Sequence, residues 1–351
     1  MFNLGEIYMK KSLIALAVLA ASGAAMAQSS VTLYGIADVW VGNVSIDNGV
    51  TDKSYTQMVS GGVSSSRWGM KGSEDLGGGL KANFQLEQGV TLDDGAATGF
   101  TRAANVGFSG GFGAVKIGVA GTAYDDAMAR SVAVFDSDLS PVNGFTLNDG
   151  SVAGLKNAGA VFKSVQYSVG KAANQIHYQA PNMGGISGAI SYALDEDTGA
   201  GKATTAFNLT YNGGPIGAEL AYQNEATEGN ANDVKFLRLG AAYNFGMATA
   251  KVQYGKVDNF GNVANAETTE WAIGADIPLS AALTVGVGYA QSQDEVAGVD
   301  GEERSGYGIA VAYSLSKRTT VYGGVKSMTY DPIVGADVDV TAYAIGVKHT
   351  F

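Results

Sequence analysis

Apolar and polar residues alternate along most of this chain with a period of two residues, the repeat expected of β-strands. One such segment, residues 80–87, reads LKANFQLE, and the last ten residues read AYAIGVKHTF. In both segments one face is apolar and the opposite face is polar or charged. Because the alternation continues to the terminal Phe351, the pattern predicts that the chain ends within a structural strand.

Short and long connectors separate the alternating segments in strict rotation. Short turns are expected near residues 73–79, 110–113, 181–185, 212–217, 244–247, 278–282 and 315–318. Longer polar connectors are expected near residues 43–61, 91–100, 120–165, 194–203, 224–233, 257–268, 291–304 and 329–338. These fifteen connections predict sixteen strands, with both chain ends on the side of the short turns. All five prolines fall in connectors, where a missing backbone donor does no harm.

A closed transmembrane barrel accounts for this organisation better than a soluble sandwich. Both would show alternating strands, but a soluble chain of this length normally divides into domains, and the sequence shows no linker. The rotation of short and long connectors is typical of outer-membrane barrels. In lipid every backbone donor and acceptor needs a partner, so the last strand is expected to pair with residues 31–40. The predicted fold class is therefore all-β, a 16-stranded antiparallel transmembrane β-barrel.

The N-terminal residues predict export from the cytoplasm. Lys10 and Lys11 precede the apolar run LIALAVLAA, and Ala25-Met26-Ala27 forms a small-x-small cleavage site. This order is typical of a secretory signal peptide, here residues 1–27, and the apolar run is too short for a membrane-spanning helix. Met9 offers an alternative start of the chain. Residues 28–351 are then expected to form the barrel.

Composition excludes several classes of protein. Without residues 1–27 the chain carries 20 basic and 32 acidic residues, a balance that argues against a nucleic-acid partner. The chain has no cysteine, so it offers no disulfide, thiolate metal site or thiol nucleophile. Fifty glycines and 17 tyrosines favour strands joined by tight turns over a helical enzyme.

Two patterns that could carry chemistry are better explained as structure, so we expect no enzyme, cofactor or metal site. Residues 107–111 read GFSGG, which matches the G-x-S-x-G nucleophile pattern, but they lead from one strand through a short turn into the next. The only histidines are His177 and His349, so the chain offers few candidates for the histidine base that a catalytic triad requires. Residues 195–199 resemble the start of a calcium loop, but Ala206 occupies the place of its closing glutamate.

Several segments resemble the general diffusion porins of Gram-negative bacteria, especially the beta-proteobacterial group. They are SSVTLYGIAD, SRWGMKGSEDLGGGLKANFQLE, NMGGISGAISY, SLSKRTTVYGG and the terminal GVKHTF. The resemblance spans essentially the whole chain after residue 27. It implies a homotrimer in the outer membrane, in contact with lipid and lipopolysaccharide, and a long third loop folded into each pore. It also implies that the barrel-assembly machinery reads the last strand with its terminal Phe351.

The resemblance also implies a pore constriction with basic residues opposite an acidic loop. The basic side falls on Arg67, Arg102 and Lys171, to which Lys71 is added because it shares the parity of Arg67. Lys171 shares parity with the polar residues of its strand, whereas Arg102 shares parity with Val106 and Phe108. The acidic side falls on the longest connector, residues 121–150, with Asp125, Asp126, Asp136 and Asp138.

The predicted function is passive diffusion of small hydrophilic solutes and ions through a water-filled channel. This chain reads GVAGTAYDD where many relatives carry a glycine-arginine-glutamine step, so one expected basic group is missing. We therefore expect only a modest preference for anions. The alternative is a barrel that mainly displays its surface loops, as an adhesin or phage receptor, and such a barrel would conduct poorly.

Overall fold

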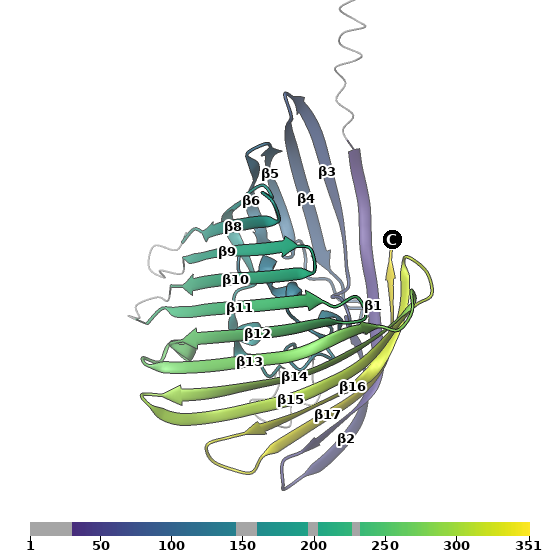
Figure 1. Ribbon diagram of the computed structural model, residues 1–351, viewed down its shortest axis with the longest axis vertical. Coiled ribbons are helices and arrows are strands. Elements are labelled where there is room, and N and C mark those ends of the chain that lie inside the picture. Colours follow the sequence, from purple (N-terminus) through teal and green to yellow (C-terminus); the bar gives the residue numbers. More distant parts are fainter. Residues whose placement is uncertain (1–29, 145–159, 196–202, 227–231) are drawn as a thin grey trace, which may run out of the picture.

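Seventeen strands form one closed antiparallel sheet in the computed structural model, which describes residues 30–144, 160–195, 203–226 and 232–351. The predicted signal peptide over residues 1–27 and the end of the predicted acidic loop, residues 145–150, lie outside the described residues. Figure 1 shows strands β8 to β17 as a curved wall, with short helical turns between β6 and β7 lying within the curve.

The strands are β1 (Ser30–Asp47), β2 (Asp52–Ser60), β3 (Arg67–Gly77), β4 (Leu80–Gly89), β5 (Ala103–Gly110), β6 (Gly113–Gly121), β7 (Lys171–Gln179), β8 (Ile186–Ala193), β9 (Thr204–Gly213), β10 (Ile216–Glu225), β11 (Val234–Asn244), β12 (Thr249–Asp258), β13 (Ala266–Pro278), β14 (Leu283–Val296), β15 (Val299–Ser314), β16 (Thr319–Asp331) and β17 (Val338–Thr350). The helical turns are η1 (Asp125–Arg130), η2 (Val134–Asp136), α2 (Lys163–Tyr167) and η3 (Phe260–Asn262). None of the helices among the described residues has the length and apolarity needed to cross a membrane.

The seventeen strands occupy sixteen positions because β2 and β3 share one. β1 pairs with β2 along Val39–Asp47 and with β3 along Ser30–Ile36. Residues 61–66, between β2 and β3, leave the ladder and surround the carboxylate of Asp38. That carboxylate accepts hydrogen bonds from the backbone N–H groups of Gly62 (3.1 Å), Val63 (3.0 Å) and Ser64 (2.8 Å). The predicted 16-stranded barrel is confirmed, with one of its strands interrupted.

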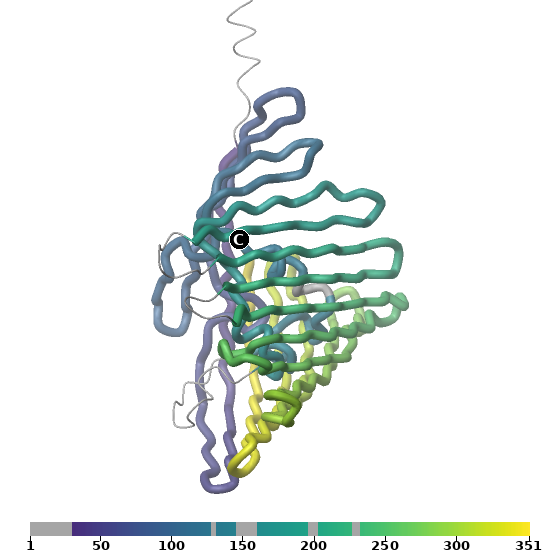
Figure 2. Tube along the Cα trace, turned by 90° about the vertical axis from the view of Figure 1, so that its left-hand side faces the viewer, coloured from purple at the N-terminus to yellow at the C-terminus, as the bar shows by residue number. Residues whose placement is uncertain are grey.

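The first and last strands close the barrel, as the sequence predicts. The register of β1 and β17 pairs Ile36 with Thr350, and Figures 1 and 2 show the last strand beside the first. The N–H of Gly35 donates to the carbonyl of Phe351 at 3.0 Å, and the N–H of Phe351 donates back at 3.1 Å. A Cβ atom at Gly35 would lie 2.2 Å from Cζ of Phe351, so the aromatic ring packs directly over the glycine.

The two faces of the wall differ in polarity. Tyr254 of β12 and Trp271 of β13 stand opposite each other, and their side chains are 41% and 42% exposed. The residues that directly precede them, Gln253 and Glu270, are 1% and 0% exposed. Most polar positions point inward, where the connector between β6 and β7 covers many of them, and most apolar positions point outward. Met328 of β16 and Val340 of β17 are exceptions, since they are buried in one apolar cluster with residues of the connector. An apolar outer face is what contact with lipid requires.

The connectors follow the predicted rotation, but two of the expected long ones are mostly strand. Residues 43–47 and 52–60 belong to the hairpin of β1 and β2, and residues 291–296 and 299–304 belong to that of β14 and β15. Residues 52–60, 291–296 and 299–304 carry polar residues on both faces, whereas residues 43–47 bury Val44 and Ile46 and have polar residues on the other face. In these polar stretches the alternation of hydrophobicity fades although the hydrogen-bonded ladder continues. The alternation depends on whether the two faces of a strand meet different surroundings, and not on the hydrogen bonds of its backbone.

Substitution of Gly35 by valine should weaken the closing seam. The added side chain meets the Phe351 ring, which must leave its place, and overpacking of this kind costs about 1–3 kcal/mol. Urea unfolding in lipid vesicles should show a lower free energy of unfolding for Gly35→Val. Ala37→Val is the matched control, because Ala37 has the same outward parity on β1 and faces His349 instead of the ring. Equal stabilities of the two variants would contradict the role assigned to the ring.

Candidate functional site

Two arginines meet one buried glutamate on the inner face of the barrel. Arg67 is the first residue of β3, Arg102 immediately precedes β5, and Glu87 lies on β4 between these strands. Nε of Arg102 lies 2.8 Å from Oε1 of Glu87, and Nε of Arg67 lies 3.9 Å from the same oxygen. Two positive groups thus share one negative group, which leaves the cluster with a net positive charge.

A tyrosine extends this cluster along the wall toward the short turns. The hydroxyl of Tyr34 donates to Oε2 of Glu87 at 2.8 Å and accepts a hydrogen bond from Nε2 of Gln85 at 2.7 Å. Nζ of Lys71 lies 5.1 Å from the centre of the Tyr34 ring, within the range of a cation–π contact. Arg67 and Arg102 therefore lie beside the carboxylate of Glu87, and Lys71 joins the same patch through the ring of Tyr34.

Arg102 contacts this patch although its parity matches that of Val106 and Phe108, which are outward-facing and 59% and 52% exposed. The reason is that β5 begins at Ala103, so Arg102 belongs to the preceding connector and the alternation of the strand does not fix its direction. For Lys171 the parity of the strand indicated an inward direction, but that parity does not reach this residue. The ladder of β6 and β7 shifts register near Asn174, which has a φ of 52°, so parity counted back from Gln175 does not apply to Lys171.

The connector between β6 and β7 lies against the inner face of the distant strands β8 to β16. Its backbone and side chains hydrogen-bond inward-facing residues from one strand after another. The contacts include the hydroxyl of Ser131 to Glu219 (2.6 Å), Nζ of Lys251 to the carbonyl of Val132 (2.7 Å), the N–H of Val134 to Asp276 (2.9 Å), the N–H of Ser164 to Glu270 (3.2 Å) and Nζ of Lys326 to the carbonyl of Asp138 (3.4 Å).

Each aspartate predicted on this connector has a polar or charged neighbour. Asp125 lies 3.4 Å from Nζ of Lys171, and Asp126 lies 2.9 Å from Nε2 of His177. Asp136 accepts a hydrogen bond from the amide of Asn143 at 2.9 Å. Burial raises the pKa of the Asp138 carboxyl well above its ordinary value, and the nearby Lys326 ammonium opposes that rise. The first two aspartates thus face β7, whereas Asp138 faces β16.

Several charged residues of this region were missed by sequence reasoning. Arg238 is 1% exposed and stacks its guanidinium 4.2 Å from the ring centre of Tyr124. Lys163 of α2 lies against the Phe260 ring and forms an ion pair with Asp294. The available signal was parity, because Arg238 lies between Leu237 and Leu239, and Glu87 shares the parity of the polar positions of β4. Parity gives the face of a side chain but not its partner on a distant strand.

The G-x-S-x-G pattern lies in an ordinary part of the barrel, and the calcium-loop pattern falls largely outside the described residues. Residues 107–111 belong to the hairpin of β5 and β6, and the hydroxyl of Ser109 accepts a hydrogen bond from Asn83 at 2.9 Å. Within the described ranges, no three or more histidine or acidic residues gather in a way that could hold a metal ion.

Comparison with known proteins identifies the family. The family model for Gram-negative porins matches residues 13–332. Outer membrane porin protein 32 of Delftia acidovorans is 37% identical over 98% of this chain and all of that protein, and an outer membrane porin of Bordetella pertussis is 28% identical over 98% and 100%.

Solved structures agree with this result. The anion-selective porin from Comamonas acidovorans superposes with a TM-score of 0.74 and 28% identity over 92% of this chain and all of that chain. Family, relatives and fold are all those of channels and not of enzymes. The chain therefore belongs to the Gram-negative porin family, and its barrel is a channel of the outer membrane.

Proposed function

We propose that this channel passes small hydrophilic solutes and ions by passive diffusion with a modest preference for anions, and that it catalyses no reaction. The observation that carries the proposal is the charge of the inner wall at β3 to β5. Arg67 and Arg102 lie there beside the carboxylate of Glu87, and Lys71 lies beside the ring of Tyr34. A water-filled pore lined by excess positive charge attracts anions and repels cations.

In this proposal the connector between β6 and β7 is the loop that narrows the pore. Its support is the series of hydrogen bonds that tie the connector to inward-facing residues from Glu219 to Lys326. Asp125, Asp126, Asp136 and Asp138 form the acidic side of the filter, and Arg67, Lys71, Arg102 and Lys171 form the basic side. Because Asp125 pairs with the ammonium of Lys171, its charge cancels little of the positive charge at Glu87.

The preference is expected to be modest because the chain as a whole is acidic. Its formal net charge of −11 lies largely in groups far from the filter. Salt screens such groups over about 8 Å at physiological ionic strength, so they weaken the attraction for anions at the mouth without reversing it in the filter. The charge at the narrowest point should therefore decide the sign of selectivity.

The surroundings of the channel belong to the same proposal. Family likeness supports a homotrimer in contact with lipid and lipopolysaccharide. The ring of Phe351, which is 50% exposed beside the closing seam, supports recognition of the last strand by the barrel-assembly machinery. An exported precursor with a signal peptide over residues 1–27 completes the proposal.

Neutralising both arginines should shift selectivity toward cations. For the double variant Arg67→Gln and Arg102→Gln, the ratio of chloride to potassium permeability should fall about two- to fivefold, since each lost charge acts within a few ångströms of a passing ion. The measurement is the reversal potential of purified protein in a planar bilayer under a potassium chloride gradient. Lys317→Gln, in an exposed turn between β15 and β16, is the control. A reversal potential equal to that of the wild type would remove the arginines from the filter.

Neutralising Glu87 should act in the opposite direction. The variant Glu87→Gln leaves both arginines without their shared carboxylate, so the permeability ratio should move about twofold further toward anions. The same bilayer measurement applies, with Glu295→Gln at the exposed tip of the β14–β15 hairpin as the control. A shift toward cations in Glu87→Gln would contradict the net positive charge assigned to the cluster.

A further inference from the structure

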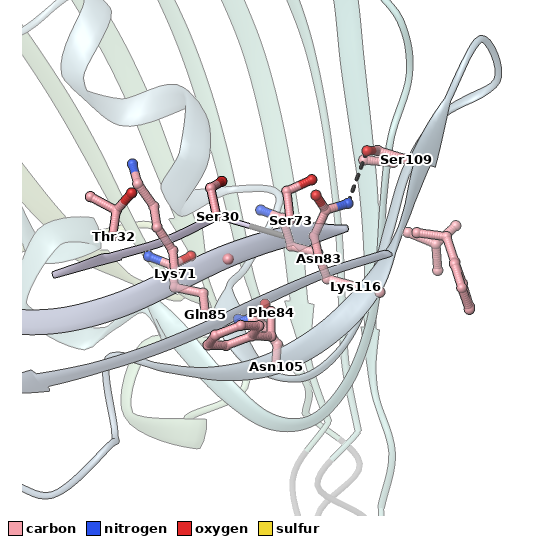
Figure 3. A pocket seen from close by; sticks show the side chains of 15 residues that line it. Ser30, Thr32, Lys71, Ser73, Asn83, Phe84, Gln85, Asn105, Ser109 and Lys116 are labelled. Atoms are coloured by element: carbon pink, nitrogen blue, oxygen red, sulfur yellow. Dashed lines mark hydrogen bonds between the residues drawn. The ribbon is translucent and has the colours of Figure 1, made fainter. Parts of the chain in front are cut away.

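A cavity opens in the inner wall next to the arginine cluster, on the side of the short turns. Its volume is about 420 Å³, within the range of ligand-binding pockets. Figure 3 shows polar side chains from β1, β3, β4 and β5 around it. The lining includes Thr32, Lys71, Asn83, Gln85, Asn105 and Lys116. Nearly all of these side chains occupy inward-facing positions, so the cavity belongs to the water-filled interior.

The cavity carries positive charge without a built-in counterion. Lys71 and Lys116 are the two basic residues among the described residues of its lining, and none of those residues is acidic. None of the ion pairs found among the described residues includes either lysine. Asp75, which shares the inward parity of Lys71, stands opposite Lys81 at the end of the hairpin. The two lysines of the cavity therefore attract an anion from solution.

The lysines stand on opposite sides of a row of neutral polar groups. In the register of the sheet, Lys71 of β3 pairs with Gln85 of β4, and Gln85 pairs with Asn105 of β5. Asn105 pairs with Gly118 of β6, and Lys116 lies two residues before Gly118 on that strand. Three strand spacings separate the lysines, about 14 Å across the wall. Long lysine side chains can reach toward each other over this distance, with amides and hydroxyls between them.

We propose that the cavity is a binding site for small, doubly negative solutes that carry hydroxyl groups, such as sugar phosphates. Lysine ammonium groups bind phosphate as point charges, and the amides of Asn83 and Gln85 and the hydroxyl of Thr32 can bond the hydroxyls of the solute. The inference rests on the proposed function, because a passive channel with a positive filter brings such solutes to the cavity.

Its location makes the site part of the route through the channel. Gln85 lines the cavity and donates to Tyr34, whose hydroxyl donates to Glu87 between the two arginines. A solute that leaves the arginine cluster toward the short turns therefore meets the cavity within a few residues of wall. A bound solute of this size occupies space and positive charge that chloride would otherwise use, so it should reduce the chloride current.

The test is the block of chloride current by glucose 6-phosphate added on the short-turn side of channels in a planar bilayer. In the wild type, current should fall as the concentration rises, and equal concentrations of uncharged glucose should have no such effect. Lys116→Gln should raise the half-blocking concentration about fivefold, because one of two attracting charges is lost. Lys116→Arg should restore most of the block. Lys81→Gln, on the same inner face but outside the cavity, is the matched control, and glucose 6-phosphate should block it at the same concentration as the wild type.

The site would be overturned if glucose 6-phosphate blocked Lys116→Gln at the same half-blocking concentration as the wild type. It would also be overturned if uncharged glucose blocked the wild type as strongly as glucose 6-phosphate does. Heat-modifiable migration in gels shows whether each variant is folded, and Lys71→Gln replaces Lys116→Gln if the latter fails to fold, with the same rise expected. The reversal potential of the wild type separates the two proposals. Anion-side reversal without block by glucose 6-phosphate rejects the cavity site alone, whereas cation-side reversal rejects the anion preference.

Discussion

The need of every backbone group for a hydrogen-bond partner in lipid is the constraint on which the rest of this structure depends. A flat sheet of this length would expose two unpaired edges, and the ladder of β1 and β17 removes both. The reciprocal hydrogen bonds between Gly35 and Phe351 carry that ladder to the last residue of the chain. Closure in turn creates an inside and an outside. The alternation of side chains then gives lipid an apolar surface and leaves charged residues around water.

One buried carboxylate links the interrupted strand to the inner connector. Asp38 holds residues 61–66 away from the ladder through three backbone N–H groups, and the hydroxyl of Tyr322 donates to the same carboxylate at 2.5 Å. The carbonyl of Gly62, freed from strand pairing, accepts a hydrogen bond from the N–H of Asp138 at 2.7 Å. The break in the wall thus provides a docking point for the connector. An interruption that would weaken an isolated sheet fixes, in this barrel, the segment proposed to narrow the pore.

Much of this fold could be predicted from the sequence because closure and contact with lipid act on every strand. The alternation, the rotation of connectors and the terminal aromatic all follow from that one constraint, and they indicate the strand number and the pairing of the ends. The site could be predicted only in part. Arg67 follows from parity, but Arg102 reaches Glu87 from a connector, and a register shift at Asn174 changes the parity of Lys171. Partners such as Arg238 and Tyr124 are brought together from distant parts of the chain, and no local pattern carries that information.

The location of charge, and not its total, governs what such a channel can pass. A chain with a formal net charge of −11 nevertheless gathers two arginines at one carboxylate on the inner wall, and Lys71 and Lys116 line the adjoining cavity. Acids of the inner connector turn to Lys171 and His177 on β7. Salt screens each group beyond about 8 Å at physiological ionic strength, so in the proposed function a passing ion responds mainly to the few side chains nearest to it. The positive groups follow one wall, from the arginines near Glu87 to the lysines of the cavity near the short turns.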